Sequence, residues 1–222
     1  MVDKNTFCVA PWYSLYLDSD KTLAPCCKIK NTQHYNYNQL EEYFNSPGLN
    51  KLRNDLLNGV KNKNCESCWR DEEQGGDSMR LISNRTIALG TKVQLANQIE
   101  NPDLSNIKSF DLTLGNLCNL KCVMCTPRLS SQLLAEANDN PALKAMHDRE
   151  FNQKDFDWPK SDDFVDWCKQ HLPQAIHIKF TGGEPFIIPW IKQVIEHIPD
   201  SQKEKCVLHF TSNLTLINES LF

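Results

Sequence analysis

The sequence predicts an α/β protein with a parallel sheet, preceded by a small cysteine-rich α+β domain. In the second half of the chain, short apolar runs alternate with segments of helical spacing, which is typical of strands joined by helical crossovers. In the first half, five of the 10 cysteines lie among short elements. We expect a domain over residues 1–100, including a linker, and a second domain over residues 101–222.

The second domain is predicted to contain three strands and three helices. The strands are expected at Phe110–Leu114, Ile176–Phe180 and Cys206–Thr211. The helices are expected at Ser130–Ala137, Asp162–Leu172 and Pro189–Ile198. Because active sites of parallel α/β folds lie at the carboxyl ends of strands, the residues that follow each strand are functional candidates.

The first domain is predicted to open with a hairpin, continue with helices and end in a linker. The hairpin has strands at Trp12–Leu17 and Thr22–Ala24 and a turn at Asp18–Lys21. Helical spacing covers Asn38–Phe44 and Leu49–Leu57, and a further helix is expected from Cys65 to Glu73. We expect a hinge at Gly75–Arg80, a helical or irregular linker to Glu100, and a break at Asn101–Asp103.

The most informative motif is the cysteine triad, Cys118, Cys122 and Cys125, directly after the first strand of the second domain. A cubane cluster normally takes four cysteine ligands, so three thiolates on one loop leave one iron open to an outside ligand. A structural zinc site and half of a ferredoxin are the alternatives. Zinc sites favour two C-x2-C pairs, and the bacterial ferredoxin run has two residues in its first gap where this chain has three.

A second motif, Gly182-Gly183-Glu184, follows the next strand. Two glycines permit a tight turn and a close approach of the backbone to a ligand. Glu184 adds an acceptor for a cationic amine. Such a segment is usually only a turn, but its position one strand after the cysteine triad makes it a candidate cofactor contact.

The two motifs together resemble the signature of radical SAM enzymes. The resemblance implies that the cysteine triad holds a catalytic 4Fe-4S cluster and that S-adenosylmethionine occupies the fourth iron. Electron transfer from a reductant such as flavodoxin or ferredoxin would then yield a 5'-deoxyadenosyl radical that abstracts hydrogen from substrate. The fold it implies is a (β/α)6 barrel, of which this chain shows three strands. We therefore expect a truncated barrel that binds the cluster and turns over poorly.

The resemblance also assigns residues around the cofactor. Gly182, Gly183 and Glu184 would contact its amino group. Met124 stands where the family often has an aromatic residue near adenine, and a thioether can fill that space. Asn213, after the third strand, is expected either to reach the methionyl part or to act only as a turn former.

The cysteines of the first domain have their own pattern. The arrangement of Cys8, Pro25-Cys26-Cys27 and Cys65-x2-Cys68 resembles the twitch or SPASM auxiliary-cluster module, which in most relatives follows the barrel. It implies that Cys8, Cys26, Cys65 and Cys68 hold a second 4Fe-4S cluster, with Cys27 a spare or alternative ligand. It also implies a peptide or cofactor precursor as substrate. A four-thiolate zinc knuckle is the alternative. The expected helix start at Cys65 would favour thiolate over thiol.

Composition excludes several other classes. The net charge of -4 gives no reason to expect nonspecific nucleic-acid binding. No stretch resembles a signal peptide or a membrane span, so we expect a cytoplasmic protein with reduced cysteines. The sequence contains no H-x3-H pair, no G-x4-G-K-[ST] loop and no G-x-G-x-x-G motif. Cys168 and Cys206 are expected to be structural. The competing functions are a two-cluster electron carrier and a zinc-stabilised interaction domain.

Overall fold

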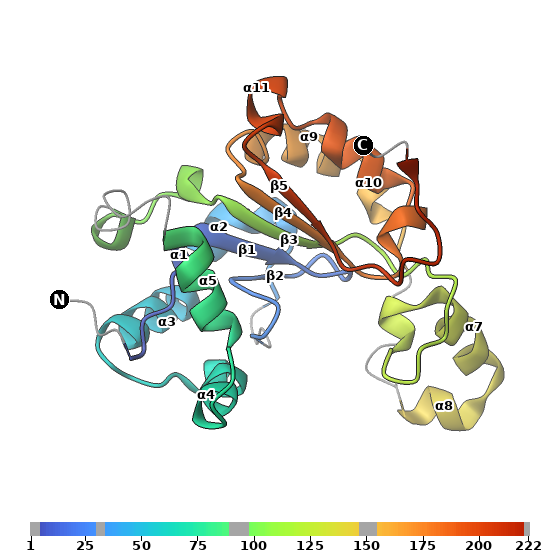
Figure 1. The fold of residues 1–222 in the computed structure, drawn as a ribbon, viewed down its shortest axis with the longest axis horizontal. Coiled ribbons are helices and arrows are strands. Elements are labelled where there is room, and N and C mark those ends of the chain that lie inside the picture. The colour runs from blue at the N-terminus through green and yellow to red at the C-terminus, as the bar shows by residue number, and fades with distance from the viewer. Residues whose placement is uncertain (1–4, 30–33, 89–97, 147–154, 220–222) are drawn as a thin grey trace. The chain divides into compact units, whose positions relative to one another are not determined.

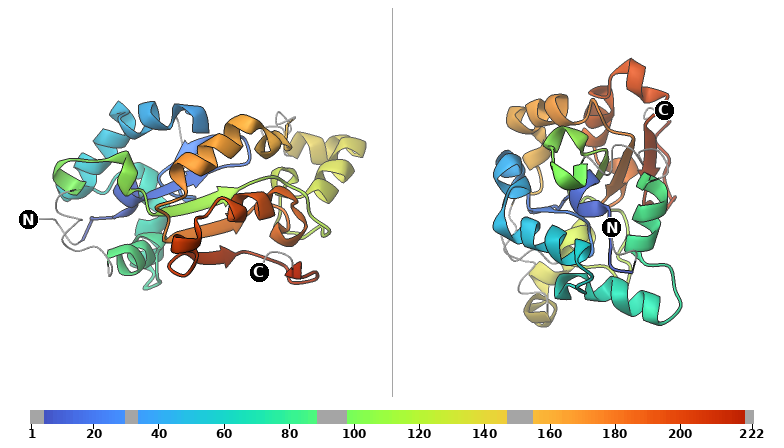
Figure 2. Two further views of the ribbon diagram at one scale, coloured as in Figure 1. Left: turned by 90° about the horizontal axis from the view of Figure 1, so that it is seen from above. Right: turned by 90° about the vertical axis from the view of Figure 1, so that its left-hand side faces the viewer.

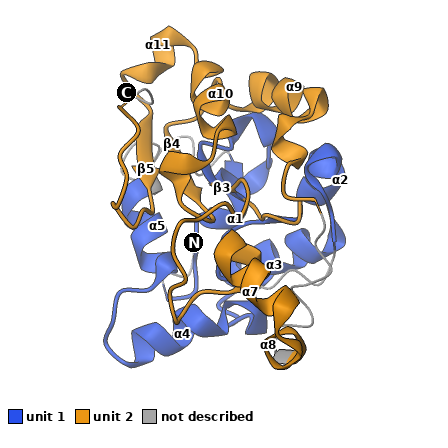
Figure 3. Cartoon of the chain, turned by 90° about the vertical axis from the view of Figure 1, so that its right-hand side faces the viewer, with its two compact units in different colours: residues 1–16, 22–111 blue, residues 17–21, 112–222 orange. Residues whose placement is uncertain are grey.

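The structure is a computed structural model that describes residues 5–29, 34–88, 98–146 and 155–219. It divides into two compact units, residues 1–16 with 22–111 (unit 1) and residues 17–21 with 112–222 (unit 2), as Figure 3 shows. The five strands form a mostly parallel sheet in the order β2-β1-β3-β4-β5. The predicted α/β class is therefore confirmed. The units divide the chain within β3, whereas the sequence placed the boundary between residues 100 and 101.

Unit 2 contains the end of β3 (Ser109–Thr113), β4 (His177–Thr181) and β5 (Val207–Phe210). Strands β4 and β5 are parallel, with His177 opposite Val207 and Phe180 opposite Phe210. Along β4, Ile178 and Phe180 are fully buried while their neighbours are partly exposed, as the two-residue period of a strand requires. All three predicted strands are confirmed, with small differences at their ends.

The helices of unit 2 follow the expected spacing. They are α7 (Ser131–Asp139), α8 (Pro141–Met146), α9 (Asp162–His171), α10 (Trp190–Glu196) and α11 (Asp200–Lys203), with single turns of 3-10 helix at Pro127–Leu129, Trp158–Lys160 and Pro185–Ile187. Helices α7 and α9 begin at serines whose side chains accept backbone N–H groups, which is why the helix starts were predictable. The short helices α8 and α11 were not predicted.

The carboxyl ends of the strands of unit 2 define one edge. Figures 1 and 2 show that the chain segments after β3, β4 and β5 gather at this edge, and that α7 and α8 lie beyond it. The functional candidates predicted from the sequence follow these strands and therefore lie at this edge.

Unit 1 consists of short elements around a small core. They are α1 (Ala10–Tyr13), β1 (Ser14–Leu17), β2 (Leu23–Ala24), α2 (Leu40–Phe44), α3 (Pro47–Leu57), α4 (Glu66–Glu73) and α5 (Met79–Ala88), with 3-10 turns at Tyr37–Gln39, Lys63–Cys65 and Leu104–Asn106. Part of the core is a cluster of Phe7, Val9, Trp12 and Tyr13. Figure 1 shows these elements in blue to green.

The predicted hairpin strand began too early. Trp12 and Tyr13 belong to helix α1, because Pro11 near its start needs no hydrogen-bond acceptor and favours the helical φ. The N–H groups of Trp12 and Tyr13 donate to the Val9 carbonyl at 3.1 and 3.3 Å. The rest of the hairpin is confirmed, since β1 and β2 are neighbours and the Lys21 N–H closes the turn on the Asp18 carbonyl at 3.0 Å.

None of the helices in the described part of the chain is both long enough and apolar enough to cross a membrane.

Candidate functional site

The glycine pair after β4 lies directly against the loop that carries the cysteine triad. The Gly183 N–H donates to the Gly115 carbonyl at 3.1 Å, and the Glu184 N–H donates to the Leu117 carbonyl at 2.8 Å. A Cβ atom on Gly182 would lie 2.5 Å from the Gly115 oxygen, and one on Gly183 would lie 2.0 Å from the Leu117 oxygen. Both distances are too short for any side chain, so the pair is required for the two loops to meet.

Glu184 is buried within this arrangement, with 1% of its surface exposed. One carboxylate oxygen accepts from the Phe186 N–H at 3.0 Å and from the Ser212 hydroxyl at 2.8 Å. The other accepts from the Asn213 N–H at 2.7 Å. Its side chain therefore joins the end of β4 to the end of β5. The expectation that it accepts from a bound amine remains a prediction, and here its oxygens serve internal donors.

Asn213 connects the same edge to the triad loop. Its side-chain amide donates to the Asn119 side-chain oxygen at 3.0 Å, and the Asn119 amide donates to the Thr215 hydroxyl at 2.7 Å. The Asn213 oxygen accepts from the Thr215 N–H at 2.9 Å, which is an Asx turn. Asn213 is thus both a turn former and a side-chain contact. Asn119 was missed by the sequence analysis, because an asparagine between two cysteines has no distinguishing spacing.

The cysteine triad lies on an exposed loop held at its base by helix α7. The Cys118 N–H donates to the Ser131 hydroxyl at 3.1 Å, and the Ser130 hydroxyl donates to the Leu120 carbonyl at 2.8 Å. The Leu120 N–H points at the Cys118 sulfur at 3.5 Å. An N–H group so placed stabilises negative charge on sulfur.

The far end of the triad loop turns outward. The Cys125 N–H donates to the Cys122 carbonyl at 2.9 Å. Cys122 is exposed, while Cys118 and Cys125 are partly exposed. The intervening Val123 and Met124 are almost fully exposed, at 104% and 94%. Met124 therefore stands in the open, beside the thiols that the resemblance assigns to the cluster.

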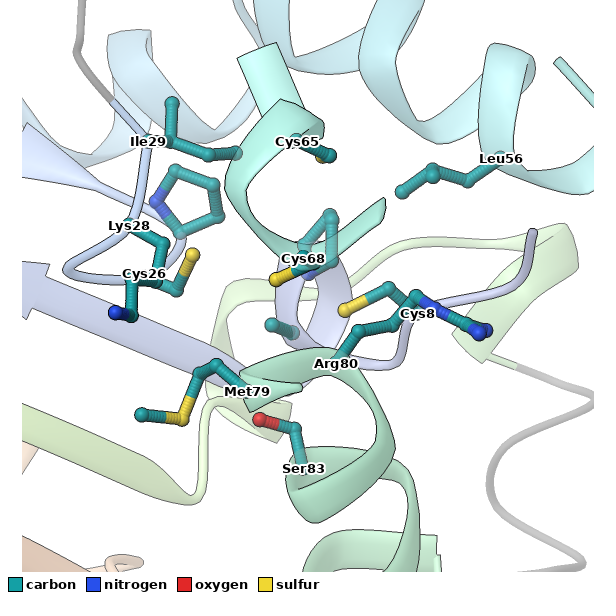
Figure 4. Close-up of a pocket in the computed structure, with 13 residues that line it drawn as sticks. Cys8, Cys26, Lys28, Ile29, Leu56, Cys65, Cys68, Met79, Arg80 and Ser83 are labelled. Atoms are coloured by element: carbon teal, nitrogen blue, oxygen red, sulfur yellow. The ribbon is translucent and has the colours of Figure 1, made fainter. Parts of the chain in front are cut away.

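The cysteines of unit 1 line one pocket. Cys8 precedes α1, Cys26 follows β2, and Cys65 and Cys68 lie at the start of α4. Figure 4 shows the sulfur atoms of Cys8, Cys26 and Cys68 directed toward the same space, with Cys65 at the start of the same helix turn as Cys68. We call this the four-thiol pocket; its empty volume is about 400 Å³ including its mouth. All four residues predicted for the second site thus line the same pocket.

Cys26 and Cys27 are separated by this geometry. Cys26 is partly buried and lines the four-thiol pocket, whereas Cys27 is exposed and is not part of its lining. Of the two, only Cys26 is among the residues that line the pocket.

Burial dominates the electrostatics of the pocket. Removal from water raises the pKa of Cys8 to about 12, with smaller contributions from the nearby Cys65 and Cys68 thiols. It also raises the pKa of Cys65 to about 12 and the pKa of Cys26 well above its ordinary value. The expectation that the helix start favours thiolate at Cys65 is therefore wrong, because desolvation exceeds the effect of the helix terminus. Binding a metal here would displace protons.

Within the described ranges, no three or more His, Cys, Asp or Glu side chains are grouped as a ready-made site for a metal ion. Cys168 is buried on α9 and Cys206 is half-buried before β5, and neither lines the four-thiol pocket. Comparisons of the chain with protein-family models, with curated proteins and with solved structures give no match.

Proposed function

We propose that this chain is a radical SAM protein in which Cys118, Cys122 and Cys125 hold a 4Fe-4S cluster with one iron open to S-adenosylmethionine. The observation that carries the proposal is the contact of Gly182 and Gly183 with the triad loop at the carboxyl edge of β3 and β4. Two motifs more than fifty residues apart in sequence are thereby adjacent in the fold, at the edge where parallel α/β folds carry their chemistry.

The donor types of the triad suit such a cluster, although the described side chains are not grouped as a ready-made metal site. The triad offers three soft thiol donors on one short loop, and nearby N–H and hydroxyl groups hold the base of that loop. The exposure of Cys122 and Met124 leaves the outer side of the loop accessible to a ligand. When bound, the cluster and S-adenosylmethionine would supply the 5'-deoxyadenosyl radical for hydrogen abstraction.

The chain's own residues would hold the triad loop and the strand ends in place around the cofactor. The glycine pair fixes the distance between the triad loop and the end of β4, and Glu184 fixes the end of β5. Asn213 would bind the methionyl part of the cofactor, and its side-chain amide now donates to Asn119 of the triad loop. A low-potential reductant such as flavodoxin or ferredoxin would supply the electron.

The four-thiol pocket supports a second 4Fe-4S cluster. All four predicted donors line it and come from three separate segments, although no three of the described cysteines are grouped as a ready-made metal site. By its likeness to auxiliary-cluster modules, this site extends the proposal to an enzyme that modifies a peptide or a cofactor precursor. A zinc ion in the pocket is the competing occupant, because four thiolates also suit zinc.

Metal analysis and turnover test the proposal together. After anaerobic purification and reconstitution, two cubanes require on the order of eight irons per chain and little zinc. Dithionite and S-adenosylmethionine should then release 5'-deoxyadenosine, and Cys122→Ala should abolish that release while retaining the second cluster. Cys27→Ala is the matched control, because it removes an exposed thiol outside the four-thiol pocket. Equal release by Cys122→Ala and wild type would refute the assignment of the triad. Iron without release would favour an electron carrier.

A further inference from the structure

Arg80 is the buried cation of the four-thiol pocket. It is the second residue of α5, only 5% of its surface is exposed, and it lines the pocket together with the four cysteines. Figure 4 shows it beside Cys8. A buried guanidinium needs compensation for its lost hydration, so its partners define its role.

Three kinds of contact fix the Arg80 side chain. Its Nε and Nη2 donate to the two carboxylate oxygens of Glu72 at 2.9 and 2.5 Å, a two-point fork. Its Nη1 donates to the Phe7 carbonyl at 2.8 Å. Its guanidinium carbon lies 5.1 Å from the centre of the Trp69 ring. The charge is therefore held in one place.

These partners are neighbours of the cysteines. Phe7 directly precedes Cys8, and Trp69 directly follows Cys68. Glu72 lies one turn beyond Cys68 on α4, the helix whose N-cap is Cys65. Arg80 thus connects α5 to two of the three segments that carry the thiols.

The positive charge of Arg80 acts on the pocket more directly than the negative charge of Glu72. Arg80 is among the residues lining the pocket, whereas Glu72 is not. A second cation, Lys28, also lines the pocket but is exposed, so water screens its charge.

We propose that Arg80 is a positioning residue that balances the charge of the second cluster and raises its reduction potential. The inference rests on the proposed occupancy of the four-thiol pocket by an iron–sulfur cluster. A four-thiolate cluster gains one negative charge when dithionite donates one electron to it. A fixed buried cation favours the more negative form, and net charge is one of the factors that set cluster potentials.

The test measures the potential of the second cluster alone. A parent variant with all three triad cysteines changed to Ala removes the first cluster, and EPR-monitored titration then gives the midpoint potential. Arg80→Met should lower the reduction equilibrium constant at least tenfold, which is a shift of about 59 mV to lower potential for one electron. Lys28→Gln, the matched control, should change the reduction equilibrium constant less than threefold. Arg80→Gln replaces the Met variant if the latter fails to fold.

Arg80→Lys separates charge from structure. Because it keeps the charge and loses the fork, its reduction equilibrium constant should stay within threefold of the parent value, whereas a merely structural role would shift the Lys and Met variants alike. An unchanged potential in a neutral variant that retains its cluster overturns the role of Arg80 alone. A parent protein that binds no iron overturns both this inference and the proposed second cluster.

Discussion

The backbone N–H of Asn213 donates to the carboxylate of Glu184 at 2.7 Å. This bond joins the end of β5 to the end of β4, and the backbone of Glu184 itself binds the triad loop through Leu117. Glu184 therefore connects the ends of β3, β4 and β5 to one another. Its function as a positioning residue follows from burial and from these partners, independently of any ligand.

Replacement of Glu184 by glutamine tests this role. The Gln amide group would present N–H donors to positions now filled by donors, so Glu184→Gln should destabilise the protein by about 1–3 kcal/mol. Urea unfolding measures the change. Glu196→Gln on the exposed face of α10 is the control and should stay within about 0.5 kcal/mol of wild type. A wild-type free energy of unfolding for Glu184→Gln would contradict the role.

Gly183→Ala tests the contact between the two motifs. An added Cβ would meet the Leu117 oxygen at 2.0 Å, so the triad loop must move. We expect loss of iron from the triad, with the second cluster retained, and destabilisation of about 1–3 kcal/mol. Iron analysis and EPR measure the occupancy of each cluster. Gly76→Ala, at the start of the segment that leads to α5, should leave triad iron unchanged; full triad occupancy in Gly183→Ala would show that the contact is dispensable.

Asp55 on α3 should make the stability of the metal-free protein sensitive to acid. Hydrogen bonds from the Lys51 ammonium at 2.9 Å and the Asn62 amide at 2.7 Å hold its pKa below the ordinary value of 3.8. Because the folded-state pKa is depressed, this contribution to stability is present above pH about 4 and is lost as the pH falls through the folded value.

Asp55→Asn should remove that part of the pH dependence, since it cannot ionise. Urea unfolding of the metal-free protein between pH 3 and pH 6 measures the slope for each variant. Asp163→Asn, an exposed carboxylate on α9, is the control and should unfold with the wild-type slope. Parallel curves for wild type and Asp55→Asn would rule out the contribution.

The regular elements were predictable because each depends on local information. Strand and helix spacing placed β4 and α9 within one residue, and Cys-x3-Cys-x2-Cys is a pattern within eight residues. The choice between Cys26 and Cys27 was not predictable, because adjacent residues of one type differ only in the direction their side chains take. Arg80 was also missed, since its contact with Phe7 spans 73 residues and no local pattern encodes it.

Trp12 and Tyr13 illustrate a different failure. The alternation of large and small residues along Trp12–Leu17 matches a strand, but Pro11 and the Val9 carbonyl impose a helical turn over Trp12 and Tyr13. A single proline outweighed the periodicity of the residues after it.

The most direct test of the central claim is the response of the triad cluster to S-adenosylmethionine. In a variant with Cys26→Ser and Cys65→Ser, which removes the second site, EPR of the dithionite-reduced protein would be recorded with and without the compound labelled with 15N at its amino group. The account predicts a changed spectrum and a resolved 15N coupling, because the amino nitrogen would bind the open iron. A cluster whose spectrum is identical in both samples, or a protein without iron at the triad, would contradict it.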